Sequence, residues 1–225
     1  MALFLERVKM SKITAIRAKR GRGKRVSIFL DGKLAFSLSA ELAAREALEV
    51  GQELSADEIE ALARQDHLER CLNAANRYLS YRPRSEAELR ERLKRRGFDG
   101  QEIEAVVSRL KQQGLVDDVA FAQFWRDNRD SFRPRSQWLL RRELRQKGVA
   151  AETIEEVVSG TSDDESAYRA ARGKARQLST ADYEGFRRRL GGFLQRRGFD
   201  YGVTNRTVRR VWEEMGNDSP PREES

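Results

Sequence analysis

The segment RPRSEAELRERLKRRG at residues 82–97 recurs in outline as RPRSQWLLRRELRQKG at residues 133–148, 51 residues later. Both copies open with the same four residues, and their leucines and final glycines stay in step. The match continues at the same offset through Leu89/Leu140, Leu93/Leu144, Gly97/Gly148, Ile103/Ile154, Val106/Val157 and Val107/Val158. Repetition at this period predicts a series of similar structural units.

Each copy carries the start and stop signals of a helix. Ser85 can cap the helix start, and Glu88 is placed three residues on to complete a capping box. Gly97 suits the left-handed position just past a helix end. A second helix ending at Gly114 is predicted, because apolar residues recur at helical spacing at Ile103, Val106, Val107 and Leu110.

A third helix is expected to begin near Asp117 and Asp118 and to bury three aromatic side chains, Phe121, Phe124 and Trp125. The two adjacent carboxylates could be read as a metal pair, but capping at a helix start explains them more simply. Each unit is therefore predicted to be a three-helix bundle that the helix from Asp117 completes.

A fainter third copy follows 101 residues after the first. Its matching positions are Leu190, Leu194, Gly198, Phe199 and Val208. The Arg-Pro-Arg-Ser opening is absent there, and residues 183–186 read YEGF instead. The sequence thus predicts three units in tandem, of which the last departs from the pattern at its start.

The N-terminal region predicts a small sheet with a helix beside it. Asp31-Gly32 favours a type I′ hairpin turn between alternating segments at residues 25–30 and 33–38. Residues 13–19 also alternate and can supply a third strand, with Gly21-Arg22-Gly23 as the loop between them. Ser39 can cap a helix running to about Leu48. Ser55 and Glu58 form a second capping-box pattern.

The expected fold is mainly α, an elongated and curved array of tandem three-helix bundles behind a β-hairpin or three-stranded sheet with helices. The expected domains are residues 1–65 for the basic N-terminal segment, 66–114 for the first part of repeat 1, 115–160 for repeat 2 and 161–215 for the degenerate repeat 3. Residues 216–225 are polar and contain prolines, which predicts a disordered tail.

Composition favours binding over catalysis. The 225 residues carry a net charge of +8, and the first 25 alone hold nine Lys or Arg against Glu6. Cys71 and His67 are the only residues of their kinds, so neither a disulfide nor a Cys/His zinc site can form within one chain. We also expect no metal, no cofactor and no enzymatic activity. Cys71 fits a core position and His67 an exposed one. No apolar run is long enough to span a bilayer, which favours a cytoplasmic protein without membrane contact.

Excess positive charge falls on the same element of every unit. Residues 82–97 carry seven basic against three acidic residues, and residues 133–148 six against one. Residues 187–198 hold five arginines and no acidic residue. Trp138 lies off the leucine stripe and is a candidate interface anchor. We therefore expect the partner-binding residues to be Arg82, Arg84, Arg90, Lys94, Arg133, Arg135, Trp138, Arg141, Arg142, Arg145, Arg188, Arg189 and Arg196.

The chain resembles the RecX family of recombination regulators over roughly residues 66–215. The resemblance rests on RYLSYRPRSEAEL at residues 77–89 with Leu93 and Gly97, GLVDDVAFA at 114–122, and LRQKGV at 144–149. The segment with the Asp31-Gly32 hairpin looks like the extension of longer family members. The resemblance implies tandem three-helix repeats that bind the RecA recombinase, mainly as its filament on single-stranded DNA, and lower its ATPase, strand-exchange and coprotease activities. It implies no catalytic residues, and we expect a monomer.

A second reading stays open from the residues alone. The basic arm at residues 12–25 and the repeat arginines could grip a nucleic-acid backbone directly. Such binding would weaken steeply with salt, by roughly 0.7 to 0.9 log units per log unit of salt for each phosphate neutralised.

Overall fold

A computed structural model describes residues 10–18, 25–178 and 182–216. The chain divides into two compact units, one of residues 1–78 and 93–106 and the other of residues 79–92 and 107–225. The predicted loop at Gly21–Gly23 and the predicted disordered tail beyond Gly216 lie outside the described residues.

The first unit begins with an antiparallel sheet in the order β3-β2-β1-β4. Its strands are β1 (Ser11–Ala18), β2 (Arg25–Leu30), β3 (Lys33–Ser39) and β4 (Glu53–Leu54). Asp31 and Gly32 both have positive φ, +49° and +81°, which confirms the type I′ hairpin between β2 and β3. The prediction of three strands was short by one, because β4 is only two residues long and carries no alternating pattern.

Two helices complete this part of the unit. The helix α1 (Ala40–Arg45) is capped by Ser39, whose Oγ accepts from the N–H of Leu42 at 3.0 Å. It ends before the predicted Leu48, where the backbone of Ala47 turns to φ +48°. The helix α2 (Ala56–Leu79) begins at the predicted capping box: the N–H of Glu58 donates to Ser55 Oγ at 3.2 Å, and the N–H of Ser55 to Glu58 Oε2 at 2.7 Å.

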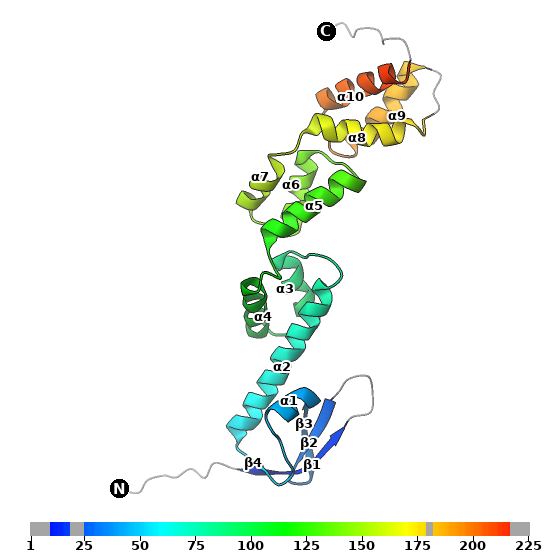
Figure 1. Ribbon diagram of the computed structural model, residues 1–225. Helices are drawn as coiled ribbons and strands as arrows, with labels where there is room; N and C mark the ends of the chain where they lie inside the picture. Colours follow the sequence, from blue (N-terminus) through cyan, green and yellow to red (C-terminus); the bar gives the residue numbers. More distant parts are fainter. Residues whose placement is uncertain (1–9, 19–24, 179–181, 217–225) are drawn as a thin grey trace. The chain divides into compact units, whose positions relative to one another are not determined.

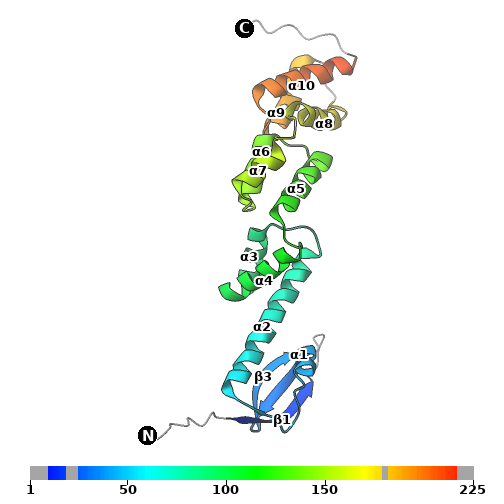
Figure 2. The same cartoon turned by 60° about the vertical axis from the view of Figure 1, so that its left-hand side comes forward.

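The start of α2 lies against one face of the sheet (Figure 2). Its Leu62 packs into a core formed by Ile13, Ile28, Leu38 and Leu42. The helix continues without a break through residue 66, where a domain boundary was expected, so no linker marks that point.

The next two helices, α3 (Glu86–Lys94) and α4 (Gly100–Gln112), have the predicted stripes. Leu89 and Leu93 are fully buried. The predicted apolar positions of α4 are also buried: Ile103, Val106, Val107 and Leu110. The periodicity is confirmed in both helices.

The second bundle consists of α5 (Asp118–Phe132), α6 (Gln137–Gln146) and α7 (Ala151–Val158) (Figure 1). Its core joins Phe121 to Leu140, Leu144 and Ile154. The prediction that the helix from Asp117 completes the bundle opened by Ser85 is therefore wrong. The apolar face of α5 is buried against α6 and α7, which follow it in the chain, and periodicity alone cannot say which neighbour a helix chooses.

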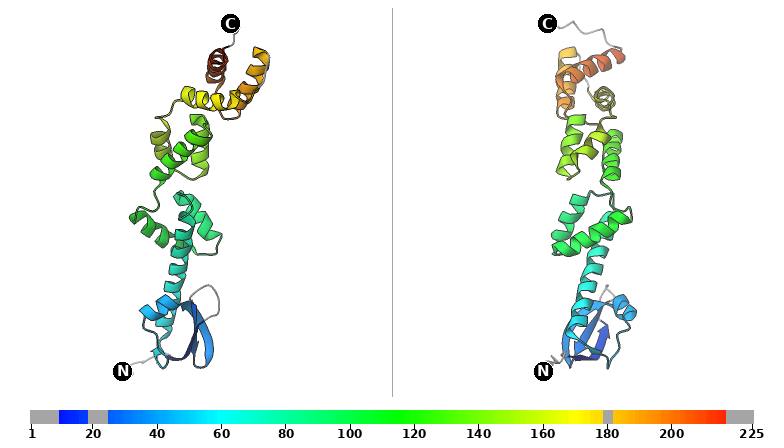
Figure 3. Two further views of the ribbon diagram at one scale, coloured as in Figure 1. Left: turned by 45° about the vertical axis from the view of Figure 1, so that its right-hand side comes forward. Right: turned by 90° about the vertical axis from the view of Figure 1, so that its left-hand side faces the viewer.

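The third bundle consists of α8 (Asp163–Ala175), α9 (Tyr183–Gln195) and α10 (Tyr201–Glu214), seen from two sides in Figure 3. Phe186, Leu190 and Trp212 lie in its core. The protein is thus mainly helical, with tandem three-helix bundles and a small N-terminal sheet. Within the described residues, no helix is both long enough and apolar enough to cross a bilayer.

Candidate partner-binding surface

The thirteen residues expected to bind a partner fall into two groups by exposure. The exposed group comprises Lys94, Arg133, Trp138, Arg142, Arg145, Arg188, Arg189 and Arg196. The half-buried group comprises Arg82, Arg84, Arg90, Arg135 and Arg141. The two groups call for different interpretations.

Four half-buried arginines pair with carboxylates of their own unit. Arg82 donates to both oxygens of Glu88 at 3.0 and 3.1 Å, and Arg141 Nε lies 2.9 Å from Glu155 Oε1. The other two pairs are Arg90 with Glu86 and Arg135 with Glu143. A guanidinium already held by a carboxylate has less to offer a partner. These positions are better explained as structural.

The Arg-Pro-Arg-Ser motif at residues 82–85 takes part in contacts within the chain. Ser85 caps α3 as predicted, accepting from the N–H of Glu88 at 3.1 Å. Its hydroxyl also donates at 2.6 Å to the backbone carbonyl of Lys147, which lies 62 residues away. Glu88 does not turn back to complete the predicted capping box. Instead, its carboxylate accepts hydrogen bonds from the guanidinium of Arg82 and, at 2.6 Å, from the Nζ of Lys147.

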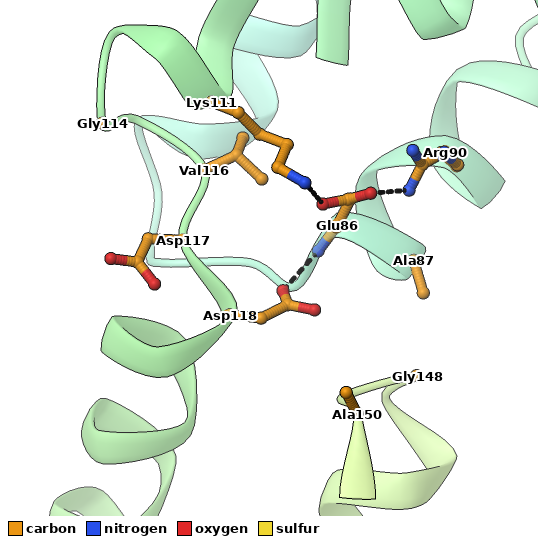
Figure 4. A pocket seen from close by; sticks show the side chains of 10 residues that line it. All are labelled: Glu86, Ala87, Arg90, Lys111, Gly114, Val116, Asp117, Asp118, Gly148 and Ala150. Atoms are coloured by element: carbon orange, nitrogen blue, oxygen red, sulfur yellow. Dashed lines mark hydrogen bonds and ion pairs between the residues drawn. The ribbon is translucent and has the colours of Figure 1, made fainter. Parts of the chain in front are cut away.

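A pocket of about 540 Å³ opens beside these contacts (Figure 4). Glu86 lies between Arg90 and Lys111, and its backbone N–H donates to Asp118 Oδ1 at 2.8 Å. Burial is the main reason that the pKa of Asp118 is raised, although the Glu86 N–H opposes it. Asp117, by contrast, caps α5 as predicted, accepting from the amides of residues 119 and 120.

We call the contacts of residues 85–88 with Lys147, Gly148 and Asp118 the first junction. A second junction repeats it between the second and third bundles. The N–H of Ser136 donates to the carbonyl of Arg197 at 3.1 Å, and the guanidinium of Arg197 donates to the carbonyl of Pro134 at 2.9 Å. Asp163 accepts from the N–H of Gln137 at 2.7 Å, as Asp118 does for Glu86. The recurring motif therefore serves these junctions.

The α5–α6 interface contains residues that the sequence analysis missed. Glu143, 9% exposed, accepts from the indole N–H of Trp125 at 2.7 Å and from Arg129 Nε at 2.8 Å. Arg135 joins the same carboxylate. Burial lowers the pKa of Arg129 and is the main cause of the lowered pKa of Arg135. One signal was available: Glu143 is the only acid of residues 133–148 and lies beside Leu144, on the buried side of the helix.

The exposed group lies on helices whose buried faces are already used. Trp138, on α6, is 59% exposed, as predicted, and the guanidinium of Arg142 lies 5.7 Å from its ring centroid. Arg145 follows at the next helical turn, which places the three side chains along one stripe. On α9 and its C-terminal end, Arg188, Arg189 and Arg196 are exposed. The stripe of Trp138, Arg142 and Arg145 is the best-formed candidate surface, and we call it the α6 stripe.

The residues with possible chemistry lie elsewhere. Cys71 is fully buried, which confirms its core position, and burial is the main reason that its thiol pKa is raised to about 11. His67 is exposed, and its Nδ1 lies 3.1 Å from Glu102. Across the described part of the chain, no three His, Cys, Asp or Glu residues gather in a way that could hold a metal ion.

Comparison with known proteins places these features in a family. Models of the RecX regulatory proteins match four segments: the N-terminal domain at residues 11–55 and the first, second and third three-helix domains at residues 71–110, 117–158 and 162–208. The regulatory protein RecX of Bacillus velezensis is 33% identical over 210 residues, covering 90% of this chain and 78% of its own. That of Streptomyces coelicolor is 36% identical over 157 residues, covering 68% and 84%. A crystal structure of a regulatory protein RecX aligns with a TM-score of 0.61 at 26% identity, over 88% of this chain and 98% of that one.

Proposed function

The chain belongs to the RecX family of regulatory proteins, and from this premise we propose that it binds the RecA recombinase, mainly as the filament on single-stranded DNA. Binding lowers the ATPase, strand-exchange and coprotease activities of the recombinase and so regulates DNA repair and recombination in the cytoplasm. The protein acts by contact and carries out no chemistry of its own.

The observation that carries this proposal is the α6 stripe. A tryptophan exposed to 59% beside two exposed arginines has the composition of an interface hot spot. Neither Arg142 nor Arg145 ion-pairs with a carboxylate among the described residues. Arg145 does lower the pKa of Glu155 through its charge, after the larger effect of Arg141, but both guanidiniums keep their hydrogen-bond donors for an acidic protein surface or for phosphate.

Inhibition follows from the tandem arrangement of the bundles. The second and third bundles are joined at the second junction by one backbone–backbone hydrogen bond and two hydrogen bonds between backbone groups and side chains, and each bundle exposes arginines. A rigid pair of bundles that touches neighbouring recombinase subunits would hold them in one geometry. ATP turnover and strand exchange both need that geometry to change.

The test is a titration of purified protein into a single-strand-dependent recombinase ATPase assay. We expect turnover to fall to a plateau with the wild type. Trp138→Ala should raise the half-inhibitory concentration by about tenfold, the effect of losing one hot-spot side chain. Phe132→Ala is the matched control, because Phe132 is also an exposed aromatic, 78% accessible at the end of α5, and lies outside the stripe.

Unchanged turnover at saturating wild-type protein would contradict the proposal. Equal effects of the two substitutions would remove the α6 stripe from it. Direct DNA binding is separated by a parallel titration of naked single-stranded DNA at several salt concentrations. Steeply salt-dependent binding to DNA, with no additional affinity for the filament, would favour a DNA-binding protein instead.

A further inference from the structure

All three three-helix domains use the same turn between their second and third helices, and we call it the glycine turn. Its glycines are Gly97, Gly148 and Gly198, with φ of +85°, +76° and +88°. In each, the N–H of the following residue closes back onto the carbonyl of a buried leucine: Leu93, Leu144 or Leu194. The three turns are therefore the same structural element.

Two of the three glycine turns pack against the start of a helix in the preceding domain. We call the helix start that receives a glycine turn a seat. A Cβ added to Gly148 would lie 2.3 Å from the Cβ of Ala87, and one added to Gly198 would lie 2.5 Å from Ser136 Oγ. No side chain fits at either position. The seats are the residues of the Arg-Pro-Arg-Ser motif and the first turn of the helix behind it, as described for the two junctions.

The turn at Gly97 has no such seat. No heavy atom of the described residues lies within 4 Å of where its Cβ would be. Its sequence nevertheless keeps the form of a seated turn, since residues 95–99 and residues 196–200 both read RRGFD. Gly97 belongs to the first three-helix domain, and the segment before it is the N-terminal domain. Among the described residues of that domain, no helix start lies within 4 Å of where the Cβ of Gly97 would be.

The third domain has no serine-capped helix start at the position equivalent to Ser85. At the 101-residue offset Phe186 falls where Ser85 lies, and Phe186 is fully buried in the core of its own bundle. The helix α9 begins three residues earlier, at Tyr183, so no cap is formed at Phe186. The three domains thus form three glycine turns and two seats, and the seats are taken by Gly148 and Gly198.

We propose that the glycine turn at residues 95–98 docks into a seat on the partner. The seat is the N-terminus of a partner helix that has a hydroxyl-bearing cap and a carboxylate in its first turn. The first junction gives this chemistry: Ser85 donates to the carbonyl of Lys147, and Glu88 binds the ammonium of Lys147. Arg96, which is exposed, stands at the position equivalent to Lys147. The inference rests on the proposed function, because the partner is then the recombinase.

The test is a filament-binding titration with two matched glycine variants. Gly97→Asn keeps a residue that tolerates positive φ but adds the side chain that both internal seats exclude. Gly114→Asn makes the same change at another helix-ending glycine, φ +68°, that also has nothing within 4 Å. We expect binding to recombinase filaments on single-stranded DNA to weaken by about tenfold or more for Gly97→Asn, as for a hot-spot contact, and by less than about twofold for Gly114→Asn.

A charge variant repeats the test without touching the backbone. Arg96→Glu should weaken filament binding, whereas Arg176→Glu, an equally exposed arginine at the end of α8, should leave it unchanged. Wild-type binding that neither Gly97→Asn nor Arg96→Glu weakens would overturn the docking of this turn and leave the proposed function standing. Absence of binding by the wild type would overturn both.

Discussion

Arg25 and Asp66 form a two-pronged ion pair in the first unit, with Nη1 3.1 Å from Oδ1 and Nη2 2.8 Å from Oδ2. Asp66 is only 3% exposed and also accepts from the N–H of Ser39 at 2.8 Å. One carboxylate on α2 thereby fixes the start of β2 and the start of α1. The pair is the polar link between the sheet and the long helix.

Asp66→Ala should loosen the sheet. The substitution leaves a half-buried guanidinium and a backbone N–H without their acceptor, at a cost of about 2–3 kcal/mol. Amide hydrogen exchange of β2 and β3 measures the effect directly. Glu60→Ala, which removes an exposed ion pair with Arg64 on the same helix, should cost no more than about 0.5 kcal/mol. Equal exchange rates in the two variants would contradict the structural role of Asp66.

Local signals predicted the local structure well. The Asp31-Gly32 turn and the Ser55–Glu58 capping box need only neighbouring residues, and both are confirmed. Glu88 shows where such signals stop. Its spacing from Ser85 is that of a capping box, but a lysine 59 residues away offers its carboxylate a charged partner. A single sequence does not tell which distant cationic side chain will pair with a given carboxylate in the folded chain.

The same limit applies to the candidate surface. Charge counting identified the basic helices, but it could not separate arginines that face solvent from those that hold the chain together. Arg135 was expected to bind a partner, and it belongs instead to the buried carboxylate of Glu143. The exposure of Trp138 was predictable because the helical wheel places it away from Leu140 and Leu144.

Gly148→Ala should destabilise the first junction. The new methyl would meet the Cβ of Ala87, and the positive φ adds strain of its own, so we expect a loss of about 2–4 kcal/mol. Denaturant unfolding followed by the fluorescence of the three tryptophans, Trp125, Trp138 and Trp212, measures it. Gly114→Ala carries the backbone strain without the clash and should cost about 1–2 kcal/mol.

A second substitution separates the two causes. Ala87→Gly removes the atom that the new methyl would hit. In the Ala87→Gly background, the loss of stability caused by Gly148→Ala should therefore lack the part due to the clash and keep only the part due to backbone strain. If Ala87→Gly gave no recovery, the contact between Gly148 and Ala87 would not be the source of the cost.

Acid should weaken the same junction through Glu88. Burial opposes its ionisation most strongly, but the bonds from Arg82 and Lys147 outweigh burial and hold its pKa below the ordinary 4.5. A lowered carboxyl pKa means that the unfolded chain takes up the proton first. The stabilisation is therefore fully present above pH 4.5 and is lost as the pH falls through the lowered pKa. Unfolding of wild type and Glu88→Gln across this range should show a stability difference that is constant at neutral pH and shrinks in acid; a constant difference would contradict the ion pairs.

Glu143 should be the most sensitive position of the second bundle. It is 9% exposed and meets the indole of Trp125 and the guanidiniums of Arg129 and Arg135. Glu143→Ala removes one acceptor from three donors and leaves two arginines crowded, a change that typically costs about 3–5 kcal/mol for a buried pair. Glu143→Gln keeps an acceptor for the indole but loses the charge, so its cost should fall between that of Glu143→Ala and zero. The emission wavelength of Trp125, read with the other two tryptophans, Trp138 and Trp212, replaced by Phe, reports whether the indole has lost its partner. Glu143 and Trp138 lie on the same helix, so filament binding by Glu143→Gln separates support from contact. Unchanged binding by a folded variant would show that the Glu143 carboxylate makes no contact with the partner.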